Sequence, residues 1–157
     1  MDKFDHIIIG GGIIGCSIAC SLARANAGSI VVFERNELAS AASSMAAGLI
    51  LQITSKPENT ALVKATLGII PTLEAETGED SGFHGVGSLR VSFEQSTIDN
   101  LKTDSNQQIN AAEAQSLVPW LQLPEQSKII NMPMDGYVDP YLFSMAYMRV
   151  AKAHGAV

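Results

Sequence analysis

The opening of the chain holds an apolar run of 17 residues without a charged side chain, IIIGGGIIGCSIACSLA, at residues 7–23. Such a run suits a membrane span, a signal peptide, or a strand that turns into a helix. Its length lies at the short limit for a span, and Asp2 and Asp5 oppose the basic start of a signal peptide. Only the third interpretation explains why three isoleucines precede the glycines and apolar residues then recur at helical spacing. The run therefore predicts a strand, a glycine turn and a helix.

The glycines of this run have the spacing G-x-G-x-x-G, at Gly10, Gly12 and Gly15. In a dinucleotide-binding turn, the first glycine permits a tight turn and the second lets the backbone approach a diphosphate. The third lets the helix pack closely on the strand. The amino end of the helix then presents free N–H groups and a positive dipole end to the phosphates. The spacing predicts a diphosphate-binding turn.

An acidic residue follows the second predicted strand, at residues 29–33. This residue is Glu34, nineteen positions after the last glycine of the motif. A carboxylate there can accept hydrogen bonds from ribose hydroxyls and repels a 2′-phosphate, which disfavours NADP. The stretch 34–52 is rich in Ala, Ser and Gly, which suits a close approach of the backbone to a large flat ligand. Within it, Ser43 or Ser44 is expected to cap a helix beside a second phosphate contact.

These motifs resemble the FAD-dependent amine oxidoreductases grouped around D-amino-acid oxidase, glycine oxidase, sarcosine oxidase and dimethylglycine dehydrogenase. The resemblance rests on DHIIIGGGIIGCSIACSLA at residues 5–23, FER at 33–35, SSMAAGL at 43–49 and DGYVDPYLFSMAYMRVAKAHGA at 135–156. It implies an α/β fold in which a Rossmann-like FAD-binding βαβ unit carries an inserted α+β portion that faces the substrate. It also implies that a small amine or amino acid is oxidised at its C–N bond by hydride transfer to the flavin, without assigning a catalytic residue.

The resemblance places the cofactor-binding residues in three groups. They are Gly10, Gly12, Ile13, Ile14 and Gly15 in the diphosphate turn, Glu34 and Arg35 at the adenosine end, and Ser43, Ser44, Ala47, Gly48 and Leu49 beside the flavin. Members with covalent FAD carry a histidine in the last group, where this sequence has Met45, so FAD is expected to bind non-covalently. None of the three histidines, His6, His84 and His154, matches that motif. No metal site is predicted.

Three segments are predicted along the chain. They are an FAD-binding unit with the flavin-side loop at 1–52, an inserted substrate-facing portion at 53–134, and a return segment with a crossover helix at 135–157. Within the last two, helices are expected at 60–76, 97–103, 111–117 and 140–153, with a strand at 88–93. Pro71 is expected to kink or break the first helix and Gly78 to end it, while Asp139 caps the last one.

Four side chains in the later segments invite a functional reading, and each also has a plainer one. Arg90 is interpreted as an exposed strand arginine rather than a partner of a substrate carboxylate. His84 is interpreted as a loop histidine with solvent or backbone partners rather than a substrate-facing group. Trp120 and Tyr137 are interpreted as packing residues rather than parts of an aromatic cage.

Charge and cysteine content narrow the partners and the compartment. The net charge of −6 and the pI of about 4.9 offer no basic stripe, so small molecules are expected as partners rather than nucleic acid or an anionic membrane. Cys16 and Cys20 lie one helical turn apart, which is a poor geometry for a disulfide. They are expected to be packed and reduced in a cytoplasmic protein.

The last residues, Ala156 and Val157, resemble the start of a further parallel strand. Two parallel strands alone are not expected to be stable. The chain is therefore expected to be part of a longer enzyme, with one half of a split enzyme or a self-pairing chain as alternatives.

The leading functional hypothesis is the N-terminal part of an FAD-dependent oxidoreductase that acts on glycine, sarcosine, dimethylglycine or a D-amino acid. The alternatives are a nucleotide-binding fragment or subunit without activity of its own, and an NAD-dependent dehydrogenase domain. The sequence leaves open the substrate, the electron acceptor and the oligomeric state.

Overall fold

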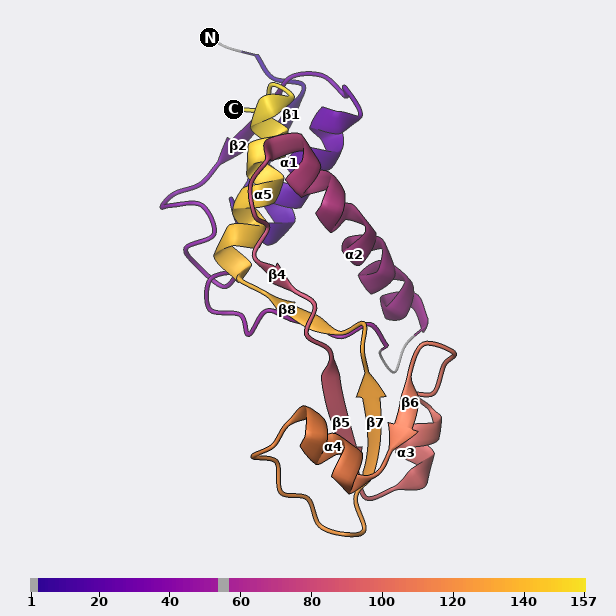
Figure 1. The fold of residues 1–157 in the computed structure, drawn as a ribbon. Helices are drawn as coiled ribbons and strands as arrows, with labels where there is room; N and C mark the ends of the chain where they lie inside the picture. The colour runs from indigo at the N-terminus through magenta and orange to yellow at the C-terminus, as the bar shows by residue number, and fades with distance from the viewer. Residues whose placement is uncertain (1–2, 54–56) are drawn as a thin grey trace. The chain divides into compact units, whose positions relative to one another are not determined.

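The fold was analysed in a computed structural model that describes residues 3–53 and 57–157 (Figure 1). The chain divides into two compact units. The first unit comprises Met1–Leu49, Thr66–Phe83 and Val138–Val157, and the second comprises Ile50–Ala65 and His84–Tyr137. The functional roles of the three segments expected from the sequence stay predictions.

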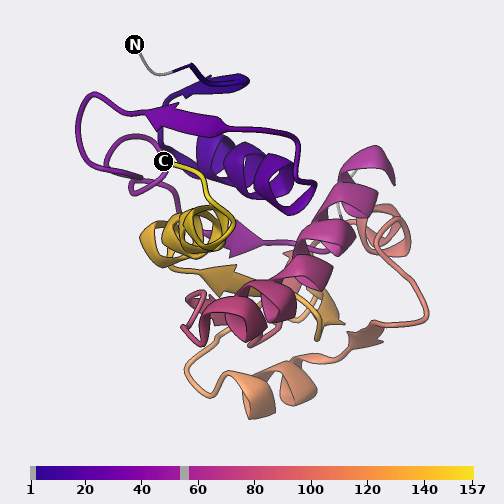
Figure 2. The same cartoon turned by 90° about the horizontal axis from the view of Figure 1, so that it is seen from above.

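The first unit is built around the predicted strand, turn and helix. Strands β1 (His6–Ile9) and β2 (Ile30–Phe33) pair in parallel, and helix α1 (Ile13–Arg24) connects them. Figures 1 and 2 show α1 lying between this strand pair and helix α5 (Pro140–Ala153). The βαβ unit predicted from the sequence is confirmed.

Helix α1 packs through small side chains. Its buried residues are Gly15, Cys16, Ala19, Cys20 and Ala23. Both cysteines are free thiols and fully buried, as expected. Burial raises the pKa of the Cys16 thiol to about 11, so the group stays protonated and behaves as a small apolar side chain.

Helix α5 begins as the sequence predicts. Asp139 is its N-cap, and Oδ1 of this residue accepts hydrogen bonds from the backbone N–H groups of Tyr141 (2.8 Å) and Leu142 (2.9 Å). Pro140 is the first helical residue, where its missing N–H costs no hydrogen bond. The helix is followed by Gly155, whose φ of +92° terminates it.

The residue after this helix end returns to the strand pair. The N–H of Val157 donates to the carbonyl oxygen of Ile30 (3.0 Å), and its own carbonyl accepts from the N–H of Val32 (2.7 Å). These two bonds form a parallel bridge beside β2. The expected approach of this segment to the sheet is therefore confirmed.

Helix α2 (Pro57–Thr77) is longer than the predicted 60–76 and runs through Pro71 without a break. The predicted alternative of a break is therefore wrong. Pro71 is exposed, so the one carbonyl that loses its N–H partner can bond to water. Gly78 ends the helix as expected, with a φ of +69° and an N–H that donates to the carbonyl of Glu74 (2.7 Å).

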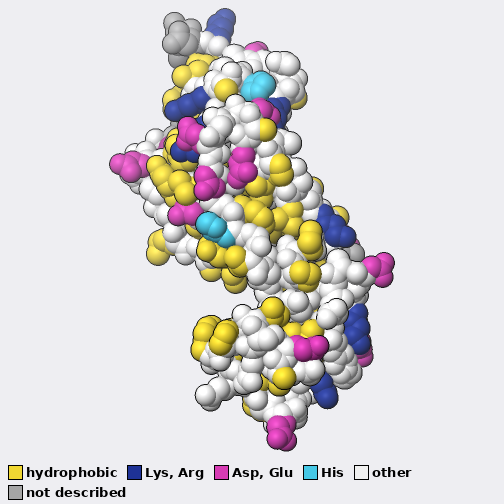
Figure 3. Space-filling model, viewed as in Figure 1, with side chains coloured by type: hydrophobic (Ala, Val, Ile, Leu, Met, Phe, Trp, Pro, Cys, Tyr) yellow, Lys and Arg dark blue, Asp and Glu magenta, His cyan; other side chains and the backbone are white. Residues whose placement is uncertain are grey.

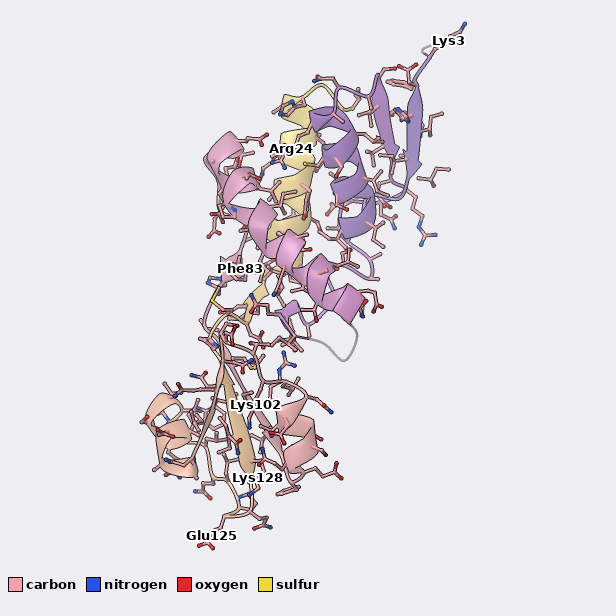
Figure 4. All side chains as sticks on the ribbon, turned by 90° about the vertical axis from the view of Figure 1, so that its right-hand side faces the viewer. Lys3, Arg24, Phe83, Lys102, Glu125 and Lys128 are labelled. Carbon is pink, nitrogen blue, oxygen red and sulfur yellow. The ribbon has the colours of Figure 1, made fainter. Side chains whose placement is uncertain are left out.

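The surface distribution of charged side chains reflects the excess of acidic residues in the sequence. Asp and Glu side chains gather on the visible face of the first unit, whereas Lys and Arg side chains are scattered (Figure 3). Arg24 is tied to this acidic surface: it forms an ion pair with Glu76 (2.6 Å) and donates to Thr72 (3.1 Å), which joins the end of α1 to α2 (Figure 4). Burial acts to raise the pKa of Glu76, but His154 and Arg24 together outweigh it and lower that pKa.

The second unit contains an antiparallel sheet of order β5-β7-β6. Its strands are β5 (Ser88–Ser92), β7 (Lys128–Met132) and β6 (Gln107–Ile109), with helices α3 (Gln95–Asp99) and α4 (Ala111–Leu117). One buried cluster comprises Ile53, Ile98, Ile130 and Met132, and another comprises Ile109, Ala114 and Ile129. Since Ile129 and Ile130 are successive strand residues, the clusters lie on opposite faces of the sheet.

Helix α4 agrees with the prediction, whereas α3 begins and ends earlier than the predicted 97–103. The Asn106 amide donates to the carbonyl of Leu101 (2.8 Å) and to the hydroxyl of Thr103 (3.0 Å), and these local bonds favour a turn over a continued helix. Trp120 is 81% exposed, so its expected packing role is wrong. Leu121 and Leu123 pack against the core cluster below α4 instead.

Three short strands were not predicted. They are β3 (Leu49–Ile50), β4 (Phe83–His84) and β8 (Gly136–Val138), and they form a sheet of order β3-β8-β4. His84 therefore lies in a strand rather than a loop, and its ring packs on the ring of Tyr137 rather than on backbone.

Across residues 3–53 and 57–157, helices long and apolar enough to cross a membrane are lacking.

Candidate cofactor site

The glycine turn between β1 and α1 requires glycine at two positions, at Gly10 because of its backbone conformation and at Gly15 because of close packing. Gly10 has a φ of +105°, and its N–H donates to the carbonyl of Phe33 (2.8 Å), which extends the strand pairing into the turn. A Cβ at Gly15 would overlap the carbonyl oxygen of Gly10. The tasks assigned to these two glycines from the sequence, a sharp turn and close helix packing, match this geometry.

The amino end of α1 carries hydrogen-bond donors. Gly12 is the N-cap and has no side chain to satisfy them. The N–H of Ile13 donates to Oγ of Ser43 (3.0 Å), while no described residue accepts a hydrogen bond from the N–H of Gly12 or Ile14. Backbone donors that point outward from a positive helix end are suited to bind an anion. The donor set therefore fits the diphosphate of a dinucleotide.

The predicted helix at Ser43 or Ser44 is absent from the structure. Residues 38–45 form turns, in which the Ser44 hydroxyl donates to the carbonyl of Ala41 (2.9 Å). Such local side-chain bonds compete with helix formation. Ser43 caps a helix that begins thirty positions earlier, at Ile13. The expectation of a local cap is wrong, and the serine serves the distant helix α1.

Glu34 lies against the glycine turn. Its Oε2 accepts a hydrogen bond from the N–H of Gly11 (2.8 Å), and its Oε1 accepts from the N–H of Asn36 (3.0 Å). These two bonds, with that of Gly11 the stronger influence, hold the pKa of Glu34 below its usual value, so the carboxylate is charged at neutral pH. The neighbouring Arg35 is exposed. A fixed carboxylate beside the turn can accept hydrogen bonds from a ribose.

Gly11 is a site residue that the sequence analysis missed. Its carbonyl accepts from the N–H of Ala39 (2.8 Å), and a Cβ on it would overlap the side chain of Leu38. The loop after Glu34 thus folds back onto the glycine turn. The signal available in the sequence was the middle position of Gly11 in a run of three consecutive glycines.

The loop of small residues at 43–49 meets β8 at Gly48. This glycine has a φ of +68°, its carbonyl accepts from the N–H of Val138 (2.8 Å), and a Cβ would overlap the carbonyl oxygen of Val138. Met45, Ala47 and Leu49 are exposed. The structure therefore brings the small-residue loop together with the Gly-Tyr-Val-Asp-Pro motif, a contact that neither motif predicts by itself.

Arg90 is neither an exposed strand residue nor a free carboxylate receptor. Its guanidinium forms an ion pair with Asp135 (Nη2 to Oδ2, 2.9 Å) and donates from Nη1 to the carbonyl of Ile53 (2.8 Å). The Asp135 side chain is 1% exposed. The predicted exposed arginine is wrong because the partner lies 45 positions away in the sequence.

Comparison with known proteins gives consistent results. The chain matches the family described as FAD dependent oxidoreductase over residues 5–157. Dimethylglycine dehydrogenase, a mitochondrial protein of Mus musculus, is 30% identical over 165 residues, which cover 99% of this chain and 19% of that protein. Glycine oxidase of Bacillus licheniformis is 31% identical over 172 residues, which cover 98% of this chain and 44% of that protein.

Solved structures extend the similarity to the fold. Glycine oxidase from Bacillus cereus matches with a TM-score of 0.79 at 27% identity, over 98% of this chain and 46% of its own. L-proline dehydrogenase from P. horikoshii matches with a TM-score of 0.85 at 25% identity, over 99% of this chain and 43% of its own. The chain thus spans less than half the length of each of these four proteins. With a glycine turn, a carboxylate fixed beside that turn and a family match over nearly all of its length, the chain belongs to the FAD-dependent oxidoreductases.

Proposed function

We propose that this chain is the N-terminal part of an enzyme that oxidises the C–N bond of a small amine or amino acid with FAD. The family match at residues 5–157 supports the class of cofactor. The similar proteins include dimethylglycine dehydrogenase, sarcosine dehydrogenase and glycine oxidase, which favours glycine, sarcosine, dimethylglycine or a related amino acid as substrate. When bound, the flavin supplies the hydride acceptor.

The observation that carries this proposal is the convergence on the glycine turn. The N–H groups of Gly12 and Ile14, which no described residue accepts from, would bind the diphosphate, and the Glu34 carboxylate would accept from the ribose of the adenosine end. In the proposed site, Gly10, Ile13 and Gly15 shape the turn, and Arg35 lies at the adenosine end. The flavin-side loop contributes Ser43, Ser44, Ala47, Gly48 and Leu49.

Non-covalent attachment of FAD is part of the proposal. Met45 occupies the loop position at which covalent members of the family carry a histidine, and a thioether does not form the corresponding flavin linkage. Denaturation with acid should therefore release all the flavin into the supernatant. Flavin that stays with the precipitated protein would contradict this assignment.

The compartment, the partners and the assembly also remain proposals. Two free, buried thiols, Cys16 and Cys20, favour a reducing compartment such as the cytoplasm. The acidic surface favours small-molecule partners over nucleic acid. A homo-oligomer or a complementing chain would extend the two-stranded parallel sheet of β1 and β2.

Flavin binding and reduction test the function. The purified protein is titrated with FAD and, separately, with NAD, and the flavin spectrum is then recorded under anaerobic conditions during addition of glycine, sarcosine, dimethylglycine or a D-amino acid. Tight FAD binding followed by bleaching with one of these amines is the expected result. Absence of FAD binding would refute the cofactor assignment, and bound FAD that no amine bleaches would refute amine oxidation.

A further inference from the structure

The peptide between Gly11 and Gly12 determines how the glycine turn faces the proposed diphosphate. Its N–H belongs to Gly12, and no described residue accepts a hydrogen bond from it. Its carbonyl belongs to Gly11, which is buried. The described peptide bonds are all trans, and in a trans peptide the carbonyl and the N–H point in opposite directions. Groups that hold the Gly11 carbonyl inside the protein therefore turn the Gly12 N–H outward.

Two donors from different segments hold this carbonyl. The N–H of Ala39, in the loop after β2, donates to it (2.8 Å). The thiol of Cys16, on the first turn of α1, also donates to it (Sγ to O, 3.4 Å). Cys16 is 0% exposed and Ala39 is 2% exposed, so water does not replace either donor. A carbonyl oxygen has two lone pairs, and these two donors occupy both of them.

Ala39 reaches the carbonyl in an unfavourable backbone conformation. Its φ is +59°, in the left-handed region that residues with a Cβ rarely adopt. Such conformations persist only where the surrounding contacts over-determine them, and they cluster at ligand-binding segments. The bond from Ala39 to Gly11 is therefore kept at a cost in backbone energy, as expected where a binding turn must hold its shape.

The donors matter because a glycine turn is easily rearranged. Without a Cβ, Gly11 and Gly12 can exchange backbone conformations that other residues cannot. Glu34 fixes the preceding peptide through the Gly11 N–H, but it does not hold the Gly11 carbonyl. Rotation of the Gly11–Gly12 peptide would leave the Cys16 thiol and the Ala39 N–H buried without an acceptor, which is unfavourable.

We propose that the Cys16 thiol, together with the Ala39 N–H, is a positioning group that locks the Gly11–Gly12 peptide and so presents the Gly12 N–H to the diphosphate. This inference rests on the proposed function, because it takes the turn to bind the diphosphate of FAD. Cys16 acts through the Gly11 carbonyl and takes no part in the oxidation. The donor set of the turn is thereby formed before the cofactor binds.

Cys16→Ala removes the thiol donor, and Cys20→Ala is the matched control. Cys20 lies one turn further along α1, is also 0% exposed, and has no side-chain hydrogen bond with a described residue. Both variants lose the same volume of buried side chain, so their stabilities should fall by similar amounts. Cys16→Ser retains a donor at position 16 and tests for rescue.

Binding is measured with FAD, with ADP and with adenosine, which lacks the diphosphate. Cys16→Ala should raise the Kd of FAD and of ADP about 3- to 10-fold, the scale of one hydrogen bond, and change that of adenosine by less than about 2-fold. Cys20→Ala should leave all three Kd values unchanged, and Cys16→Ser should bind FAD within about 2-fold of wild type.

The carbonyl carbon resonance of Gly11 reports on the anchor in the FAD-free protein. It should move in Cys16→Ala and keep its position in Cys20→Ala. A Gly11 resonance that Cys16→Ala leaves in place would overturn the inference, and so would equal Kd values for FAD in Cys16→Ala and Cys20→Ala. A loss in Cys16→Ser as large as that in Cys16→Ala would overturn it too, since the donor would then not be the acting group.

Failure of the proposed function has a different signature. A wild-type protein that binds neither FAD nor ADP would refute the cofactor assignment, whereas the Gly11 resonance would still decide whether the Cys16 thiol anchors the turn.

Discussion

The ion pair between Arg90 and Asp135 should stabilise the second unit far more than a surface pair. Asp135 is 1% exposed and accepts bonds from Gln52, Ser88 and Arg90, while Arg90 also donates to the carbonyl of Ile53. Removal of one partner leaves a buried group without its counter-charge. The cost then includes desolvation that is no longer offset.

Arg90→Met is the appropriate change, because it keeps an apolar stem of similar length and removes the guanidinium. Breaking a buried pair from one side costs about 3–5 kcal/mol. The Gln52 N–H and the Ser88 hydroxyl still donate to Asp135 in this variant, so the loss of unfolding free energy should lie near the lower end of this range, at about 3 kcal/mol. With a urea slope of about 2 kcal/mol per M, the midpoint of unfolding should fall by about 1.5 M.

Lys102→Met provides the control. The Lys102 ammonium lies 2.7 Å from Asp99, closer than the atoms of the Arg90 pair, but these side chains are 46% and 52% exposed. Its loss should cost about 0.5 kcal/mol or less. The comparison therefore separates burial from distance as the source of stability.

Two measurements test the reasoning. Urea unfolding followed by circular dichroism gives the midpoints, and hydrogen exchange of the Gln52 amide reports on its bond to Asp135. Exchange at Gln52 should accelerate in Arg90→Met and stay unchanged in Lys102→Met. Equal midpoint shifts in the two variants, with Gln52 exchange unaffected in both, would refute a dominant role for burial.

Four further predictions concern the cofactor site and α1. Gly15→Ala should abolish FAD binding and lower the melting temperature, because its Cβ would overlap the carbonyl of Gly10; FAD titration and thermal unfolding measure both effects. Ser43→Ala should cost about 1 kcal/mol in urea unfolding through the lost cap on α1. With a pKa of about 11, the Cys16 thiol should be about 0.1% ionised at pH 8 and should react with iodoacetamide far more slowly than a free cysteine, as followed by mass spectrometry. Folding lowers the pKa of Glu34, so the stability that this carboxylate contributes should be complete above its unfolded pKa of about 4.3 and be lost as the pH falls through the folded pKa. The Glu34→Gln variant should therefore lose less stability than wild type when the pH is lowered, as measured by urea unfolding at a series of pH values.

The elements predicted correctly from the sequence are those specified by neighbouring residues. Helix α5 has its cap at Asp139, its proline at position 140 and its terminating glycine at position 155, all within the segment that forms it. The βαβ unit is likewise marked by an isoleucine run and a fixed glycine spacing. Local chemistry determines these elements, so a sequence alone reveals them.

The features missed from the sequence depend on distant partners. Strands β3, β4 and β8 are two or three residues long, which is too short for an alternation of apolar and polar residues that would distinguish them from a loop. The Arg90 side chain is only 21% exposed because it pairs with the distant Asp135, and Trp120 is exposed because two leucines fill the core below α4. Contacts between residues far apart in the sequence determine the structure and exposure of these residues, and the type of a single residue does not reveal such contacts.

The candidate cofactor site combines both kinds of information, and this has a consequence for how it can be altered. Glu34 accepts a hydrogen bond from the N–H of Gly11, and Ser43 accepts one from the N–H of Ile13 at the start of α1. The N–H of Gly12 remains available to a diphosphate. The loop that is proposed to hold the cofactor therefore also stabilises the helix to which the cofactor binds. A ligand that binds only the folded arrangement raises stability in proportion to the logarithm of its concentration. Changes at Glu34 or Ser43 should thus weaken FAD binding and the stability of α1 together.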